Sequence, residues 1–341
     1  MGITLGCGDS GHPSQGEVGA TAAEVVGGWA ATADQIFATV EIRRAGASSG
    51  FCSGTVISPS IVVTAAHCAV VEPEQGQVRP AGPGTLWVVA GHLASHAVGD
   101  DMIRFVTEVR VHEEYDHDFI MGRTRAGAGQ GGIGSPNDIA LLFLSSPFDH
   151  IPSAPLLTFE RQRELVHHGD VGFVAGYGVF DLDEGSTGEL YITDAVIDII
   201  GPRELMTRRG DQLGDSCYGD SGGPLYVPTD HGDFLVGLVS RGRSDVKRDC
   251  GDGGVYTLIS AHLPWIAQTA PSRFEPVLES GDQDVSFLAE GAGPISAPKG
   301  GSLHRARTCA ASIPQSGGHS PAPAFALLVG LAFWSRRLSR R

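Results

Sequence analysis

Short runs of β-forming residues recur along most of the chain and constrain its fold more than any other feature. Eleven runs rich in Val, Ile, Thr and Phe lie between Ile36 and Ile259, and turn residues separate most of them. No sustained helical period appears before residue 260, so the pattern predicts an all-β sandwich or a pair of barrels. The runs are IFATVEI, GTVIS, IVVTAA, LWVVAG, RFVTEVRV, IALLFL, GFVAGYG, LYITDAVIDI, PLYV, FLVGLVS and VYTLI.

A short helix is expected to close this β-rich body. The segment SAHLPWIAQTA, residues 260–270, is the candidate, and Pro264 is expected in its first turn, where the missing N–H costs no hydrogen bond. The sequence that follows is rich in Gly, Pro, Ser and acidic residues, which is the composition of a linker. The expected organisation is a pro-segment or signal remnant (1–24), a folded body (25–270), a disordered linker (271–308) and a tail (309–341).

The charge of the chain argues against one broad class of partner. The 341 residues hold 24 Lys and Arg against 39 Asp and Glu, and residues 25–270 alone hold 16 basic and 31 acidic residues. Binding a nucleic-acid backbone needs a basic stripe, so we expect no nucleic-acid partner. With 41% hydrophobic residues, the chain is able to bury a core and is not a disordered polyanion.

The two ends of the chain differ from the body. Residues 1–24 lack both the charged n-region and the apolar h-region of a secretory signal, so they are not such a signal as written. The tripeptide that ends at Cys7 is similar to the end of a bacterial lipoprotein signal, and the alternative is an incidental cysteine in a disordered pro-segment.

The tail holds Cys309, an apolar run at 324–334 that is too short for an ordinary transmembrane helix, and a terminal Arg cluster. It resembles C-terminal sorting signals of some Gram-negative bacteria, and the alternative is a frayed amphiphilic tail. Either end could anchor the protein at a membrane.

Three short motifs hold residues suited to joint chemistry. VVTAAHC contains His67, SPNDIALLFL places Asp138 just before an apolar run, and GDSCYGDSGGPL places Ser221 in a Gly-rich turn. Alone, the histidine could be a hydrogen-bonded core residue and the aspartate a strand cap. The serine turn is more specific, because a nucleophilic serine needs an exposed Oγ and nearby backbone N–H donors for the substrate carbonyl. Gly219 lets the backbone direct its N–H inward with no side chain in the way.

Together these motifs resemble those of the trypsin-like serine proteases of the chymotrypsin family. The resemblance covers residues 25–270 and rests on VVGG, TAAHC, NDIALL, GDSGGP, VSRG and GGVYT, with His, Asp and Ser in the order that this family uses. It implies two packed six-stranded antiparallel β-barrels with a short C-terminal helix and a site in the cleft between the barrels. The implied activity is that of a serine endopeptidase without a cofactor.

The resemblance implies a role for each motif residue. Ser221 is the nucleophile, His67 is the general base and later the acid, and Asp138 fixes the imidazole tautomer. The backbone N–H groups of Gly219 and Ser221 form the oxyanion hole. The rival interpretations are a catalytically inactive protease-like binding protein at the cell surface and a surface-anchored interaction protein. The complete set of His67, Asp138 and Ser221 argues against the first, and a linker too short for a folded domain argues against the second.

Specificity for Arg or Lys before the scissile bond is also implied. Asp215 lies six residues before the serine, at the base of the primary pocket, and Ser216 follows it. A buried carboxylate there favours a cation. Gly242 and Gly254 match the small wall residues of such a pocket, and Ser240 belongs to the strand that pairs with the substrate main chain.

The sequence departs from the family pattern at the rim of this pocket. Arg241 stands where the family usually has Trp, and seven residues, RSDVKRD, separate Gly242 from Cys250, which is longer than in trypsin. Preferences for the more distant residues of a substrate are therefore not implied by the resemblance.

Activation is expected to follow the family's logic. Cleavage before Val25 frees an amine that pairs with Asp220, the residue before the serine. Glu24 precedes that bond, so an Arg/Lys-specific enzyme cannot activate itself there, and a separate activating protease is expected.

Cysteine usage indicates export to an oxidising compartment, so the protein is expected to be secreted or on a bacterial cell surface. The two bridges that the resemblance implies are Cys52–Cys68 and Cys217–Cys250. Of the six cysteines, Cys7 and Cys309 are left over, one in each atypical end.

Two further patterns do not support a cofactor or metal. Glycines at 127, 129 and 132 match a dinucleotide fingerprint, but no strand–turn–helix surrounds them, which favours a surface insertion. The His- and acid-rich segment 112–117 lacks the spacing of a metal site and is expected to be a solvated loop.

Overall fold

Two closed barrels of six antiparallel strands form the core of this computed structural model. The structure describes residues 28–35, 38–73, 77–123, 132–179, 187–210, 214–247, 250–271, 277–278 and 285–287. The chain divides into two compact units, Met1–Lys299 and Gly300–Arg341, and every described residue belongs to the first. The expected fold class, a trypsin-like pair of barrels with a short C-terminal helix, is confirmed.

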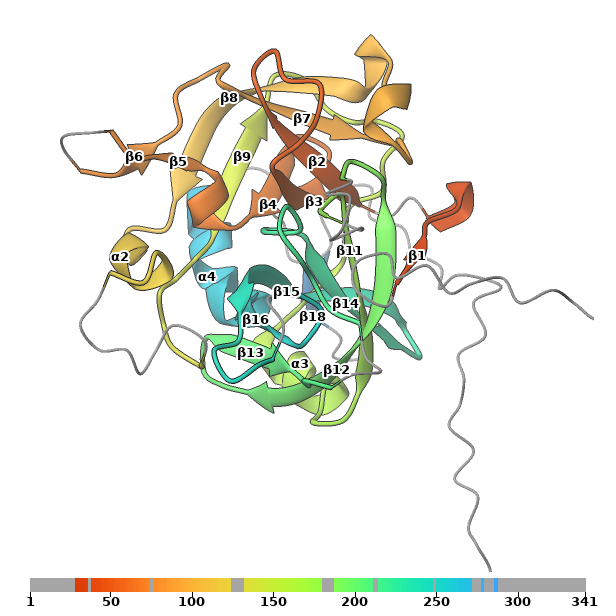
Figure 1. Ribbon diagram of the computed structural model, residues 1–341, viewed down its shortest axis with the longest axis vertical. Helices are drawn as coiled ribbons and strands as arrows, with labels where there is room; N and C mark the ends of the chain where they lie inside the picture. The colour runs from red at the N-terminus through yellow and green to blue at the C-terminus, as the bar shows by residue number, and fades with distance from the viewer. Residues whose placement is uncertain are drawn as a thin grey trace, which may run out of the picture. The chain divides into compact units, whose positions relative to one another are not determined.

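The first barrel lies in the upper half of Figure 1 and closes in the order β2-β3-β4-β9-β8-β7. Its β-branched residues suit pleated strands, and side chains such as Val40, Ile42 and Val62 are fully buried. The strands are β2 (Thr39–Arg44), β3 (Cys52–Ser58), β4 (Ile61–Thr64), β7 (Leu86–Ala90), β8 (Ile103–Val111) and β9 (Ala140–Leu144).

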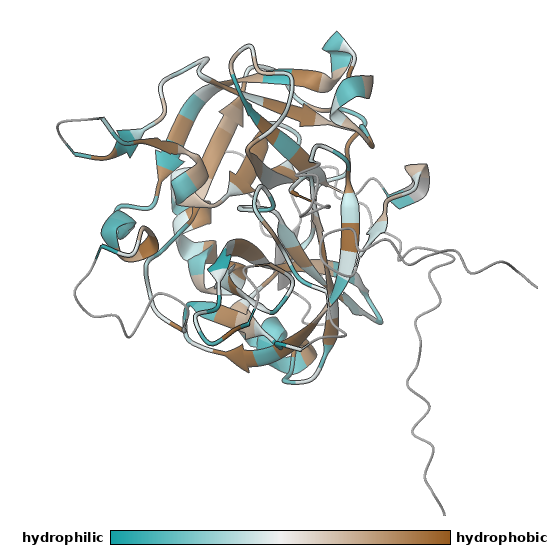
Figure 2. Ribbon diagram, viewed as in Figure 1, coloured by the Kyte–Doolittle hydropathy of each residue, from teal (hydrophilic) through white to brown (hydrophobic). Residues whose placement is uncertain are grey.

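The second barrel lies in the lower half of Figure 1 and follows the order β14-β11-β12-β13-β16-β15, which the pairing of β14 with β15 closes. Its core includes Val174, Leu225 and Tyr256. Hydrophobic residues concentrate on the strands of both barrels in Figure 2. The strands are β11 (Val171–Gly176), β12 (Tyr191–Ile200), β13 (Glu204–Thr207), β14 (Pro224–Thr229), β15 (Gly232–Gly242) and β16 (Gly254–Leu258).

The closing helix is α4 (Ile259–Thr269), and its buried Ile259, Leu263 and Ile266 belong to the same apolar cluster as the first barrel. The expectation that Pro264 lies in the first turn is wrong, because Pro264 lies inside the helix, in its second turn. Burial of this apolar face holds the helix together across the hydrogen bond that proline cannot donate.

Eleven of the twelve barrel strands coincide with runs expected from the sequence. The twelfth, β13, has the sequence ELMT and lacks the β-branched run that marks the others. The short helix α3 (Phe159–Leu165) was also not expected; the Thr158 side chain caps it by accepting a hydrogen bond from the Arg161 N–H.

Several small elements flank the barrels. The segment expected to be a disordered linker contributes two short strands, and the second of them pairs with the free edge of β10. The remaining elements are β1 (Trp29–Ala30), β5 (Val70–Val71), β6 (Arg79–Pro80), β10 (Leu156–Leu157), β17 (Val277–Leu278), β18 (Val285–Phe287), α2 (His117–Ile120) and the 3₁₀ turns at Ala33–Gln35, Ala66–Cys68, Ser95–Ala97 and Asp100–Met102.

Candidate active site

His67 lies in the 3₁₀ turn that follows β4, and it contacts Asp138 twice. The backbone N–H of His67 donates to Asp138 Oδ1 at 3.0 Å, and the ring Nδ1 lies 2.8 Å from Oδ2. The disulfide between Cys52 and Cys68 ties this turn to β3, with 6.1 Å between the two Cα atoms. Backbone and ring of His67 are thus both fixed by the same carboxylate.

Asp138 is fully buried just before β9, at a place where the backbone is unusual. The preceding Asn137 is the one non-glycine residue with positive φ (+50°) among the described parts of the chain. Its side-chain amide donates to the carbonyl oxygens of Glu114 and Ser135, which holds this conformation. Asp138 Oδ2 also accepts a hydrogen bond from Ser240 Oγ at 2.7 Å.

The charges of this pair stabilise each other. For Asp138, burial acts to raise the pKa, but the charge and hydrogen bonds of His67 and the bond from Ser240 hold the pKa below its usual value. For His67, burial acts to lower the pKa, but the charge and hydrogen bond of Asp138 raise the pKa above its usual value. The imidazole is therefore set to accept a proton.

Ser221 lies in a tight turn between β13 and β14 that two left-handed glycines shape. Gly219 has φ +94°, and Gly222 has φ +78° with Thr64 so close that any side chain there would collide with it. The Ser221 carbonyl accepts from the Ser53 N–H at 2.9 Å and lies 3.5 Å from Cys68 Sγ. The turn of Ser221 is thus held against β3 and against the disulfide that ties the His67 turn to β3.

Asp220 is fully buried in the same turn. Its carboxylate accepts from the backbone N–H of Gly178 at 2.9 Å and of Cys217 at 2.8 Å. Burial dominates and raises the pKa of Asp220 to about 7, with a further contribution from the charge of Asp215. Within the described ranges no cation pairs with Asp220. Its expected partner, Val25, lies outside the described residues.

Asp215 lies behind this turn, with only 1% of its surface exposed. Oδ1 accepts from the N–H of Ser216 at 2.6 Å, from the Ser216 hydroxyl at 3.0 Å and from the Tyr256 hydroxyl; Oδ2 accepts from the Thr207 hydroxyl. Burial raises the pKa of Asp215 despite these neutral donors. A Cβ at Gly254 would lie 2.9 Å from Oδ1, so only glycine leaves the carboxylate its space.

Sequence reasoning did not single out Thr207 and Tyr256. Tyr256 lies in the recognised GGVYT stretch and could have been found there, whereas Thr207 is in the unexpected strand β13. The expected disulfide between Cys217 and Cys250 is present, with 4.8 Å between its Cα atoms, and it joins the Asp215 segment to the segment before β16.

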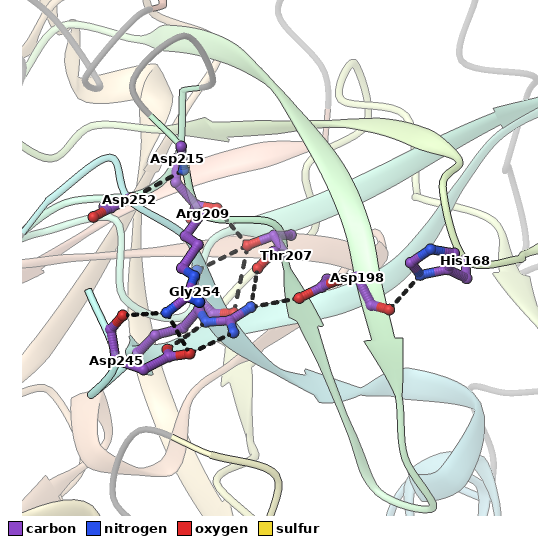
Figure 3. Close-up of polar contacts among 10 residues, drawn as sticks. His168, Asp198, Thr207, Arg209, Asp215, Asp245, Asp252 and Gly254 are labelled. Atoms are coloured by element: carbon purple, nitrogen blue, oxygen red, sulfur yellow. Dashed lines mark hydrogen bonds and ion pairs between the residues drawn. The ribbon is translucent and has the colours of Figure 1, made fainter. Parts of the chain in front are cut away.

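A polar network includes Asp215, Thr207, Asp198 and Asp245 (Figure 3). Arg243 follows the β15 strand and donates to the Thr207 carbonyl at 2.7 Å, to Asp198 Oδ2 at 2.8 Å and to both Asp245 carboxylate oxygens at 2.8 and 3.0 Å. Asp252 accepts the backbone N–H groups of Gly210 and Lys247. These bonds order the lengthened loop that follows Gly242.

Ser240, Arg241 and Gly242 end β15, as expected, and the last two pair with β16 through Val255 and Gly254. The Arg241 guanidinium forms two bonds with Glu204, at 2.6 and 2.9 Å. The altered rim is thus built around a buried ion pair.

The His67 region is also the site of a group of possible metal-ligating atoms among the described residues: Cys52, His67 and Cys68. Both sulfurs are consumed in a disulfide, so this group is not a metal site. No helix in the described ranges is long and apolar enough to cross a membrane. The leftover Cys7 and Cys309 and the apolar run of the tail lie outside the described residues.

Comparisons with known proteins agree with the fold. The trypsin family model matches residues 25–266. Hypodermin-B of Hypoderma lineatum is 30% identical over 263 residues, which cover 73% of this chain and 88% of that protein. Trypsin-1 of Astacus astacus is 27% identical over 66% of this chain and 90% of its own length. The vitellin-degrading protease of Bombyx mori is 27% identical over 67% and 78%.

The chain therefore belongs to the trypsin family of serine proteases. The family model covers both barrels and most of α4, and it begins at the residue where the body was expected to start.

Proposed function

We propose that this protein is a serine endopeptidase that cleaves peptide bonds after Arg or Lys through an acyl-enzyme. The observation that carries the proposal is the hydrogen-bonded chain from Ser240 through Asp138 to His67, next to the left-handed turn that presents Ser221. A buried carboxylate that orients an imidazole beside a serine is the arrangement that activates a hydroxyl for attack on a carbonyl.

The reaction proceeds in two halves. Ser221 Oγ attacks the substrate carbonyl carbon while His67 Nε2 takes the hydroxyl proton; Asp138 holds Nδ1–H and stabilises the imidazolium. The N–H groups of Gly219 and Ser221 stabilise the oxyanion, and each such donor lowers the barrier by about 3–4 kcal/mol. His67 then protonates the leaving amine, and water releases the acyl group by the same steps.

Specificity for Arg or Lys is supported by Asp215. Its carboxylate is buried, and its donors among the described residues are neutral, so an arriving guanidinium or ammonium group would supply a positive charge. The family resemblance makes Gly242 and Gly254 the small wall residues that leave room for a long side chain, and a Cβ at Gly254 would crowd Asp215.

Activation is proposed to depend on a new N-terminus at Val25. A freed amine carries a positive charge that an intact amide lacks. Asp220 is buried, which raises its pKa, and such an amine would neutralise the negative charge of its carboxylate. Because Glu24 precedes the bond, a protease of other specificity makes this cut. N-terminal sequencing of active material should begin at Val25, and any other start contradicts this step.

Secretion is proposed on the strength of the two disulfides, which persist in oxidising compartments. The arthropod relatives give no support to a bacterial cell surface. We propose residues 1–24 as a removed pro-segment, 25–270 as the mature domain, 271–308 as a linker and 309–341 as a processing tail. One intact-mass measurement of the mature protein reports both ends and any lipid on Cys7 or Cys309.

Covalent labelling by a fluorophosphonate tests the central proposal. The processed protein should be labelled, and peptide mapping should place the label on Ser221. Ser221→Ala should remain folded by circular dichroism, take no label and lose about six orders of magnitude in kcat. A folded, processed protein that takes no label would instead be the inactive binding homologue.

A further inference from the structure

Arg241 is a largely buried cation that contacts Ser240, next to the candidate catalytic residues, and it takes no part in the proposed reaction. It stands on β15 between Ser240 and Gly242, where the family resemblance leads one to expect Trp. Its side chain is 9% exposed, and that of its partner Glu204 is 1% exposed. A buried ion pair costs desolvation free energy, so its position calls for an explanation.

The guanidinium of Arg241 is held in one orientation from three sides. Glu204 accepts from it with both carboxylate oxygens, and the Gly132 carbonyl accepts from Nη2 at 2.8 Å. The ring of Phe119 lies 5.1 Å from Cζ. Glu204 in turn accepts from the Gly134 N–H at 2.6 Å. Arg241 and Glu204 thus fasten both described ends of the insertion before Asp138 to the second barrel.

The same guanidinium begins a hydrogen-bonded chain to the imidazole. Arg241 Nη1 donates to Ser240 Oγ at 3.2 Å, and Ser240 Oγ donates to Asp138 Oδ2 at 2.7 Å. Asp138 Oδ2 lies 2.8 Å from His67 Nδ1. Because the guanidinium donates and cannot accept, the single proton of the Ser240 hydroxyl is directed at Asp138.

We propose that Arg241 is a positioning residue for the catalytic pair: it fixes the Ser240 hydroxyl on Asp138 and places a positive charge at the end of the hydrogen-bonded chain that leads to His67. The proposal rests on the proposed function and adds a residue that the family pattern does not contain. Trp at this position would supply neither the charge nor the bond to Ser240.

The electrostatic surroundings of His67 agree with this role. Burial lowers the pKa of His67, the charge of Asp138 raises it, and the charge of Arg241 lowers it again. In the described parts of the chain, Asp138 and Arg241 are the charged groups that act on the imidazole. The charge of Asp138 also acts to raise the pKa of Tyr115, before α2, and of His262, in α4.

The negative charge of Glu204 weakens the effect of the Arg241 charge on the pKa of His67. Its carboxylate neutralises the guanidinium at close range, and its Oε1 shares Arg241 Nη1 with the Ser240 hydroxyl oxygen. Removing Glu204 should therefore strengthen the effect of Arg241, and removing Arg241 should abolish it. The two substitutions are expected to shift the titration of His67 in opposite directions.

The test is the titration of the His67 ring by NMR in the full chain, in a Ser221→Ala background that needs no enzymatic activity. The His67 signal is assigned by its loss in His67→Gln. Arg241→Gln should move the midpoint up by about half a pH unit, and Arg241→Lys, which keeps the charge, should restore most of the original value. Glu204→Gln should move the midpoint down.

Arg243→Gln is the matched control, because it removes an equally buried, ion-paired guanidinium two residues away that does not contact Ser240. Its His67 midpoint should stay in place even where its melting temperature falls. An unmoved midpoint in Arg241→Gln, or an equal movement in Arg243→Gln, overturns the proposal. If Arg241→Gln does not fold, the direction of the Glu204→Gln shift decides.

Activity provides a second readout that separates this proposal from the proposed function. In the processed Ser221 protein, the acidic limb of the kcat/KM profile should move with the NMR midpoints across the same variants. A protein that takes no phosphonate label but shows the NMR shifts would retain the role of Arg241 and lose the proposed peptidase activity. A protein that is labelled and active but shows no NMR shifts would retain the proposed peptidase activity and lose the role of Arg241.

Discussion

The buried carboxylates of the candidate active site fall into two contrasting regions. Asp138, at the edge of the first barrel, faces an ionisable partner in His67, and its pKa is held below the usual value. Asp215 and Asp220, between β13 and β14 of the second barrel, accept hydrogen bonds from neutral N–H and O–H groups, and burial raises the pKa of both. Similar burial thus has opposite consequences, because among the described residues only Asp138 contacts a partner that is able to carry a positive charge.

The contrast indicates which parts of the site are complete within the unprocessed, substrate-free chain. Asp138 already has a partner that is able to carry a positive charge, His67, at 2.8 Å. Asp215 and Asp220 reach the same condition only when cations arrive, which we infer to be the side chain of the substrate and the amine of the new N-terminus. On this proposal, the second barrel holds the parts of the site that respond to substrate and to processing.

The largest effect is expected from the complete region. Asp138→Asn keeps the shape of the side chain but stabilises the wrong imidazole tautomer, so kcat for an Arg peptide should fall by about 10⁴-fold. Steady-state kinetics on the processed protein provide the measurement. Activity within tenfold of the parent would show that Asp138 does not orient His67.

A somewhat smaller effect is expected at Asp215. Asp215→Asn removes the charge that an Arg side chain would neutralise, so the preference for Arg over Phe in kcat/KM should fall by about 10³-fold or more. Asp252→Asn is the matched control, since Asp252 is also buried in this region but binds the backbone of Gly210 and Lys247. A parent that prefers Phe or Ala over Arg would contradict the assignment of the pocket.

Asp220 should make the unprocessed chain less stable as the pH rises. Its pKa is about 7 in the folded chain against 3.8 for the ordinary group, so the folded state binds the extra proton between these values. Stability contributed by that proton is present below pH 4 and is lost as the pH rises through 7, by at most about 4 kcal/mol. Urea unfolding of the unprocessed Ser221→Ala chain between pH 4 and 8 measures this loss.

Two comparisons sharpen that measurement. Asp220→Asn should flatten the decline, and cleavage before Val25 should do the same by providing a cation. Asp138 should change stability in the opposite direction, because its pKa in the folded chain is lowered. The stability that its carboxylate contributes is present above the ordinary pKa and is lost as the pH falls through the pKa of the folded chain. A stability profile that Asp220→Asn leaves unchanged would contradict the idea of an unneutralised carboxylate.

The smallest effect concerns the acidic body as a whole. Residues 25–270 carry 31 acidic against 16 basic residues, so a strongly basic peptide should be attracted at long range. Its kcat/KM should fall a few-fold as the ionic strength rises from about 0.01 to 0.15 M, where the screening length shortens from about 30 to 8 Å. A peptide with the same Arg but neutral flanks is the control. Equal responses would confine the electrostatic preference to Asp215.

Local sequence signals predicted the strands well because each carries its own pattern. Runs such as IVVT and LWVVA combine β-branched residues with flanking turn residues, and they form β4 and β7. The strand β13 lacks such a run and exists because β12 and β16 pair with it on either side. Pro264 was misplaced for a related reason, since burial of α4 against β10 and β15 outweighs the local preference of proline.

The motifs around His67, Asp138 and Ser221 were legible from the sequence because each requires particular residue types in a fixed local order. Left-handed glycines at 219 and 222 and cysteines at bridging positions belong to the same local information. The contact between Asp138 and His67 spans 71 residues of chain, and that between Ser240 and Asp138 spans 102. The family resemblance implied the first contact, and the structure supplies its geometry.

The residue types, the strand pattern and the family were thus available from the chain as a string of letters. Tertiary structure decided the surroundings of each charge: that Thr207 and Tyr256 bind Asp215, that Asp220 is buried without a cation in the described parts of the chain, and that Arg241 reaches both Glu204 and Ser240. Such pairings depend on which strands the barrels bring together, and charge energies depend on burial and distance, neither of which a sequence motif contains.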